Sequence, residues 1–108
     1  MKPIQFEGDS LKQLRGVPKP VRHDLGYQLY LVQQGKQPLD FKPMPAVGPG
    51  VEEIRVRDAS GAYRAMYTAR FAEAVYVLHV FQKKTRATSS QDIELAAKRL
   101  AALLRRRR

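Results

Sequence analysis

Three consecutive segments in the middle of the chain constrain its fold more than any other feature. In residues 51–58, apolar Ile54 and Val56 alternate with charged side chains, which is the period of a strand with one buried face. Residues 62–69 predict a second strand, and residues 75–82 predict a third that is apolar on both faces. Because the connections are short, we expect an antiparallel meander whose last strand is central and covered by helices.

Helical periodicity flanks this meander. Across residues 20–34, apolar residues recur at steps of four, four and three, which predicts an amphipathic helix that Gly35 can end. A second apolar stripe predicts a helix over residues 88–104, begun by a capping box of Thr88 and Gln91. Both helices are expected to pack on the sheet.

The other segments are shorter or irregular. Residues 4–6 predict a strand, and the short helix that follows can be capped by Asp9 or Ser10 and ended by Gly16. Residues 36–50 are rich in proline and glycine, which predicts a long loop of the kind that often carries function.

Together these elements give the order β-α-α-β-β-β-α, an α+β fold with two N-terminal helices and a C-terminal helix. A length of 108 residues fits one domain over residues 1–108, ending in the basic tail 105–108. Five apolar residues are expected in the core, namely Leu29, Ile54, Val56, Leu78 and Leu100.

The charge balance indicates a polyanionic partner. Twenty lysine and arginine residues face ten acidic residues, which gives a formal net charge of +10. Residues 51–108 hold thirteen basic and six acidic residues, so +7 of this charge lies in the second half. Such a field favours nucleic acid, the ribosome, an acidic protein or an anionic membrane surface, and we expect the site in the second half.

Several classes of chemistry find no support in the residues. The chain has no cysteine, which excludes disulfides, thiolate metal sites and cysteine nucleophiles. No zinc-ligand spacing, nucleotide-binding loop or Ser/His/Asp set is visible, so we predict neither a metal nor a cofactor. The N-terminus lacks the apolar region of a signal peptide, and the longest apolar run, residues 74–81, is too short to span a bilayer. We therefore expect a cytoplasmic protein with no membrane partner.

Strand parity groups the charged side chains of the meander. If the three strand faces coincide, a carboxylate, three guanidinium groups, an imidazole and an amine lie on one surface, although the register cannot be read from the sequence. These residues are Glu53, Arg55 and Arg57 on the first strand, Arg64 on the second, and His79 and Lys83 on the third.

Such a set suits RNA cleavage without a metal. The ribose 2′-hydroxyl attacks the adjacent phosphate, which requires a base, cations that stabilise the phosphorane, and an acid for the leaving oxygen. An arginine fork matches phosphate oxygens, an imidazole moves protons near neutral pH, and a carboxylate among arginines stays ionised. The catalytic candidates are Arg64, His79, Glu53 and Arg55, and the RNA-binding candidates are Arg57, Lys83, Lys84 and Arg86.

Each assignment competes with a plainer interpretation. Charged residues on an antiparallel strand usually form a solvated face, and a single histidine in a strand is more often structural than catalytic. Tyr63 and Tyr67 can stack on bases, but they fit the core better. His23 is expected to be exposed and without function.

The strand motifs also resemble one known family in their order and spacing. They are a Glu-hydrophobic-Arg strand at 51–57, Tyr-Arg-x-x-Tyr at 63–67 and His-x-Phe-x-Lys-Lys-Thr within 77–85. With the final helix, they are similar to the phage-derived HigB-like branch of the RelE/ParE toxin superfamily. The resemblance covers nearly the whole chain and is best over 51–100.

This resemblance implies a RelE-like fold and the toxin of a type II toxin–antitoxin system. Many such proteins cut mRNA in the ribosomal A site. They are silenced by a helix-turn-helix (HigA-like) antitoxin, which would also provide the only link to operator DNA. The positions that match the family are Glu53, Arg55, Arg64, His79, Lys83 and Lys84.

Two other functions stay open at this point. ParE-like relatives share the fold but poison DNA gyrase and cut no RNA. A decayed toxin would bind only its antitoxin and operator DNA. The basic meander face favours RNA, although an acidic antitoxin would explain the charge equally well.

Overall fold

A computed structural model describes residues 1–107 and confirms the α+β class predicted from the sequence. A five-stranded sheet lies between helices in these residues. In chain order the elements are β1 (Ile4–Phe6), α1 (Ser10–Gly16), α2 (Lys19–Gln33), β2 (Phe41–Pro43), β3 (Val51–Asp58), β4 (Gly61–Thr68), β5 (Val75–Lys83) and α3 (Ser90–Arg106).

The sheet has the strand order β1-β5-β4-β3-β2. Strands β3, β4 and β5 form the predicted antiparallel meander. The sheet is nevertheless mixed, because β1 pairs with β5 in parallel. Strand β5 therefore lies between β1 and β4, in the interior position that its two apolar faces predict.

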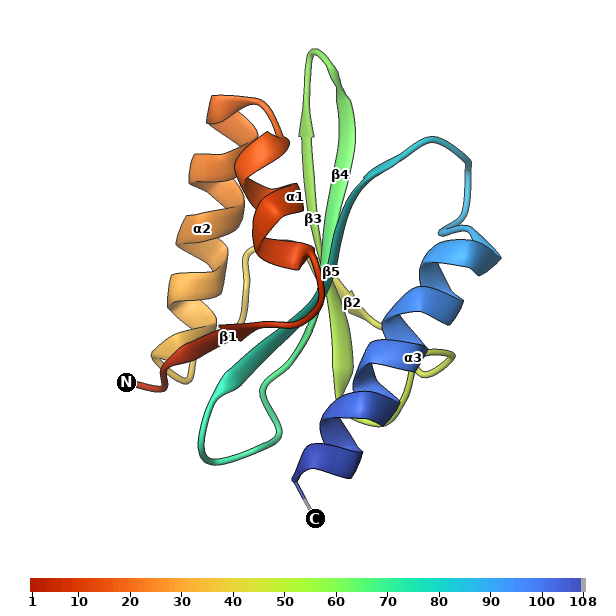
Figure 1. Ribbon diagram of the computed structural model, residues 1–108. Helices are drawn as coiled ribbons and strands as arrows, with labels where there is room; N and C mark the ends of the chain where they lie inside the picture. The colour runs from red at the N-terminus through yellow and green to blue at the C-terminus, as the bar shows by residue number, and fades with distance from the viewer. Residues whose placement is uncertain (108) are drawn as a thin grey trace.

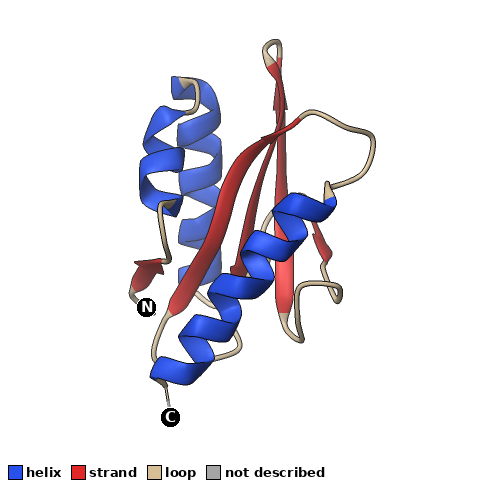
Figure 2. Ribbon diagram, turned by 45° about the vertical axis from the view of Figure 1, so that its right-hand side comes forward, coloured by secondary structure: helices blue, strands red, loops and turns tan. Residues whose placement is uncertain are grey.

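Two helical layers cover the two faces of the sheet. Figure 1 shows α1 and α2 on one face and α3 on the other, and Figure 2 shows α3 lying diagonally across its face. The apolar stripe of α2 packs against Ile54 and Val56, whereas Leu100 and Leu103 of α3 pack against Met66. All five residues predicted to lie in the core are buried: Leu29, Ile54, Val56, Leu78 and Leu100.

A β-bulge in β5 decides which side chains face α3. The pairing of β4 with β5 skips Leu78, since Met66 is opposite His79 and Tyr67 is opposite Val77. Leu78 belongs to the α3-side core, and the neighbouring His79 bonds to a residue of α3. The extra residue thus turns two consecutive side chains toward the same helix.

The predicted loop at residues 36–50 is partly wrong, because it contains the edge strand β2. Phe41, Lys42 and Pro43 pair antiparallel with Ile54, Glu53 and Glu52, respectively. A three-residue strand bounded by proline is too short to produce a readable alternation, and proline is tolerated there because the strand lies at an edge.

The N-terminal cap of α3 differs from prediction, and that of α1 is at a predicted residue but lacks the capping hydrogen bond. Helix α3 is capped by Ser89, not Thr88, and the Ser89 hydroxyl accepts a hydrogen bond from the Asp92 amide at 3.2 Å. Thr88 instead donates to a carboxylate on the sheet. Asp9 occupies the cap position of α1 but makes no capping hydrogen bond, because its carboxylate binds Arg99 at 2.6 Å and Gln13 at 3.2 Å.

The basic tail predicted at residues 105–108 is largely part of α3 or docked beside it. Helix α3 continues to Arg106, which pairs with the buried Glu7. The Arg107 guanidinium lies 3.7 Å from the ring centroid of Phe71 and donates to Glu73 at 3.1 Å. Arg108 lies outside the described residues.

Truncation of Leu78 tests the packing of α3 on the bulge. Leu78 is fully buried, so Leu78→Ala is expected to lower the free energy of unfolding by about 2–5 kcal/mol. Leu39→Ala is the matched control, because Leu39 is 72% exposed and should change stability by less than about 0.5 kcal/mol. Urea denaturation measures both. Equal midpoints for the two variants would contradict the packing described here.

Candidate functional site

The register brings the predicted charged residues onto one surface, the face of the sheet that α3 crosses. Cross-strand partners align as Lys42–Glu53–Met66–His79, then Arg55–Arg64–Phe81, then Arg57–Ala62–Lys83. We call the charged members of these rows the charged face: Lys42, Glu53, Arg55, Arg57, Arg64, His79 and Lys83.

Glu53 and Arg64 form a buried ion pair at the centre of the charged face. Their side chains are almost inaccessible to solvent, and Arg64 Nε lies 3.5 Å from Glu53 Oε1. Arg64 also donates from Nη1 to the carbonyl of Tyr63 at 2.9 Å. Burial lowers the pKa of the Arg64 guanidinium and the Glu53 charge opposes that shift, so the group remains cationic at neutral pH.

His79 lies one row away and is held on two sides. Its Nε2 donates to Asp92 Oδ1 at 2.7 Å, and its ring stacks on Phe81 with centroids 4.7 Å apart. Asp92 is itself fixed by the Ser89 hydroxyl, which donates to Oδ2 at 2.6 Å. The first turn of α3 thereby contacts the imidazole directly.

The buried groups of this cluster are incompletely satisfied. Within residues 1–107, the buried side-chain nitrogen and oxygen atoms without a hydrogen-bond partner are Glu53 Oε1, Arg64 Nε and His79 Nδ1. Two of these atoms, Glu53 Oε1 and Arg64 Nε, face each other at 3.5 Å in the ion pair, so they have a charged partner without hydrogen-bond geometry. All three atoms belong to residues that the sequence singles out as catalytic candidates.

Cations surround this centre. Arg57 is exposed, while Arg55 and Lys83 are half-buried. Burial lowers the pKa of the Lys83 amine, with the nearby charge of Arg64 as the second cause. An anion bound here would relieve this mutual repulsion, so the cations around the Glu53–Arg64 pair suit a phosphate group.

Lys84 and Arg86 do not lie on the charged face. Both are exposed on the segment that joins β5 to α3, and neither forms an ion pair within the described residues. They follow Lys83 in the sequence but belong to none of the cross-strand rows.

Sequence reasoning missed three residues of this site. Lys42 lies in the row of Glu53, but its strand was predicted as loop. Thr88 donates from Oγ1 to Glu53 Oε2 at 2.8 Å, and Asp92 binds His79. The Ser-x-x-Asp spacing at 89–92 marks a helix start, but nothing in the sequence shows which strand that start meets.

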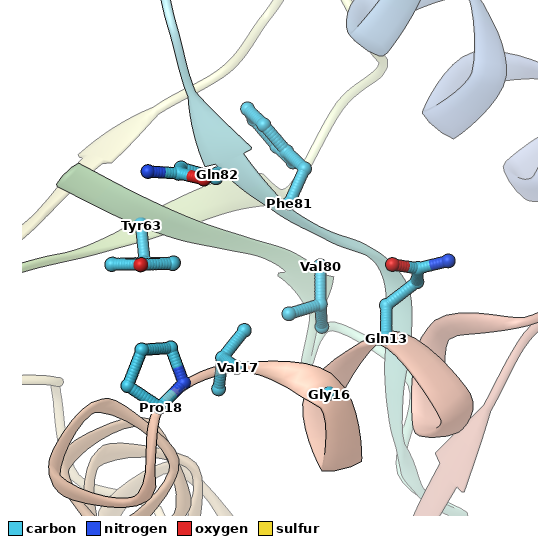
Figure 3. Close-up of a pocket in the computed structure, with 8 residues that line it drawn as sticks. All are labelled: Gln13, Gly16, Val17, Pro18, Tyr63, Val80, Phe81 and Gln82. Atoms are coloured by element: carbon cyan, nitrogen blue, oxygen red, sulfur yellow. The ribbon is translucent and has the colours of Figure 1, made fainter. Parts of the chain in front are cut away.

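The opposite face of the sheet offers no comparable chemistry. Tyr63 and Tyr67 are buried in the core beneath α2, as their plainer interpretation predicts. Burial and a hydrogen bond to Glu52 raise the pKa of the Tyr67 phenol, which therefore stays neutral. A pocket of about 220 Å³ opens beside Tyr63, and Figure 3 shows it lined only by uncharged residues. Within residues 1–107, no group of three His, Asp or Glu side chains could hold a metal ion.

Comparison with known proteins identifies the family. Residues 12–101 match the family described as Phage derived protein Gp49-like (DUF891), and this span holds every candidate residue of the site. The chain belongs to this family. It is a RelE/HigB-type toxin family, so the resemblance seen in the strand motifs is confirmed.

A solved structure supports the same fold. The chain is similar to the E. coli toxin RelE, solved as a double arginine-to-alanine mutant in the free state, with 24% sequence identity and a TM-score of 0.69. The match covers 92% of this chain and 97% of that one. No curated protein sequence matches the chain. None of the helices in the described residues of this Gp49-like protein is long and apolar enough to cross a membrane.

Proposed function

We propose that this Gp49-like protein is the toxin of a type II toxin–antitoxin pair and acts as an endoribonuclease on mRNA at the ribosome, in the cytoplasm. The observation that supports this proposal is the placement of the buried Glu53–Arg64 ion pair one row from His79, on the face of the sheet that also carries Arg55, Arg57 and Lys83. An acid–base pair of groups beside a fixed guanidinium is the set that 2′-hydroxyl attack requires.

The proposed reaction transfers the phosphate within the RNA strand. The 2′-oxygen bonds to phosphorus and the bond to the 5′-oxygen breaks, which leaves a 2′,3′-cyclic phosphate and a 5′-hydroxyl. His79 and Glu53 are the proton carriers for the 2′-hydroxyl and the leaving oxygen. Arg64, supported by Arg55, stabilises the charge of the phosphorane. No step in this scheme uses a metal or cofactor.

The cations around the Glu53–Arg64 pair position the RNA backbone. Lys42, Arg57 and Lys83 hold phosphates beside the scissile one, and Lys84 and Arg86 extend the path toward α3. The formal charge of +10 favours both RNA and an acidic antitoxin. We propose a helix-turn-helix, HigA-like antitoxin as the protein partner and the only link to operator DNA.

Expression without an antitoxin tests the proposal. We expect growth arrest through lost translation, with new mRNA 5′ ends inside coding regions when these ends are mapped after induction. Arg64→Ala at equal protein level is the control and should give neither effect. Arrest with intact mRNA and an SOS response would instead assign the protein to the gyrase poisons.

A further inference from the structure

The side chains proposed to cleave RNA are buried in the free protein. Exposure is 0% for Glu53, 3% for Arg64 and 7% for His79. A guanidinium this buried cannot hold a phosphate oxygen, because the phosphate would need the space above the sheet. Above Glu53 and His79 that space is taken by Thr88, which leads into α3, and by Asp92 in the first turn of α3.

Two hydrogen bonds fasten this segment to the sheet. Thr88 donates to Glu53 Oε2 at 2.8 Å, and Asp92 accepts from His79 Nε2 at 2.7 Å. The other ring nitrogen of His79 is buried and has no partner. In this arrangement neither imidazole nitrogen can exchange a proton with RNA.

We propose that residues 88–92 form a cover over Glu53 and His79 that must leave the charged face before RNA can bind, so that the structure shows a closed resting form. The effect of the cover on RNA cleavage rests on the proposed function, whereas the two hydrogen bonds that close the cover do not. The cover keeps the acid–base groups away from RNA until an RNA backbone competes for them.

The remainder of α3 is anchored separately, so the cover can open without loss of the helix. Arg99 binds Asp9 at 2.6 Å and the carbonyl of Leu78 at 3.0 Å. Leu100 and Leu103 are buried against the sheet. The contacts that close the cover therefore lie at one end of the helix, and those that hold the helix lie at the other.

RNA itself is suited to open the cover. Lys84 and Arg86 are exposed cations just before the cover, and Glu53 and His79 lie beneath it. A phosphate backbone bound to these two cations gains a further contact with His79 only when the cover has moved. Because a ligand shifts an equilibrium by its differential affinity for the two states, RNA favours the open form.

Chemical modification of histidine measures opening directly. The chain has two histidines, of which His23 is exposed and His79 lies under the cover. Diethyl pyrocarbonate should modify His23 quickly and His79 slowly, and mass spectrometry of peptides separates the two rates. His23 is then the internal reference for reagent and protein concentration.

Thr88→Val is the test variant, since it removes one closing bond without altering His79. Loss of a hydrogen bond to a charged group shifts an equilibrium by about 10- to 160-fold, so we expect His79 modification to rise by up to that factor. RNA cleavage should rise in parallel. Thr85→Val is the matched control, because the Thr85 hydroxyl bonds only to the backbone of Ala87, and it should change neither rate.

The outcomes separate the cover from the nuclease. Unchanged His79 reactivity in Thr88→Val would overturn the cover. Faster modification with slower cleavage would also overturn it, because the closed arrangement would then be the active one. Faster modification with no RNA cleavage by any form, wild type included, would retain the cover and remove the ribonuclease proposal.

Discussion

Arg64→Ala is expected to reduce RNA cleavage more than any other loss of a single arginine, by about 10²–10³-fold. Arg64 is fixed in mid-strand by its bond to the Tyr63 carbonyl and by Glu53, so its guanidinium is already held in place when the cover opens. Its charge is permanent, which allows it to stabilise the phosphorane without moving a proton. Single-turnover cleavage of a short RNA measures the loss.

Arg64→Ala also leaves Glu53 buried without its cation, which can cost about 3–5 kcal/mol of stability. Arg64→Lys separates the two effects, since it keeps a charge beside Glu53 while removing the bidentate fork. We expect Arg64→Lys to fold, by circular dichroism and urea denaturation, and to remain inactive. Arg15→Ala, which removes an exposed arginine of α1, is the control for net charge. A folded Arg64→Lys with wild-type cleavage would show that the site lies elsewhere.

The regular parts of this fold could be predicted because an element with one buried face has apolar residues at regular intervals in the sequence. The stripe of α2 and the alternation of β3 each record a face that must avoid water. The place of Lys42 in the sheet was not predicted, because β2 has only three residues, two of them exposed. Such a short strand shows no alternation of apolar and polar residues. The family motifs could be recognised because they lie within the most regular strands, 51–83.

The site could be predicted only in part, because it depends on contacts between elements distant in sequence. Parity placed Arg64 and His79 on defined faces of their strands, but the bulge at Leu78 sets the face of His79 relative to the start of β5. Thr88 and Asp92 reach the site from the start of α3, across 35 and 13 residues of sequence. Neither separation has a local signature, so the closed arrangement of the site emerges only from the packed structure.

His79→Ala is expected to lower RNA cleavage by about 10²–10⁴-fold if the imidazole carries a proton. This substitution separates two roles of His79, because the ring also holds the cover in place through Asp92. If the ring served only as that fastening, its removal would open the cover and raise cleavage, as is expected of Thr88→Val. The two roles therefore predict changes of opposite sign for the same substitution.

His79→Gln provides the second arm of this test. A glutamine amide can donate to Asp92 as the imidazole does, but it cannot take up and release a proton near neutral pH. Proton transfer by His79 predicts that both variants are inactive although circular dichroism shows them folded, with His79→Ala the less stable because it loses the ring stacked on Phe81. Cleavage retained in His79→Gln and increased in His79→Ala would refute the proton-transfer role. It would leave Glu53, at the centre of the charged face, as the group that must take the 2′-hydroxyl proton.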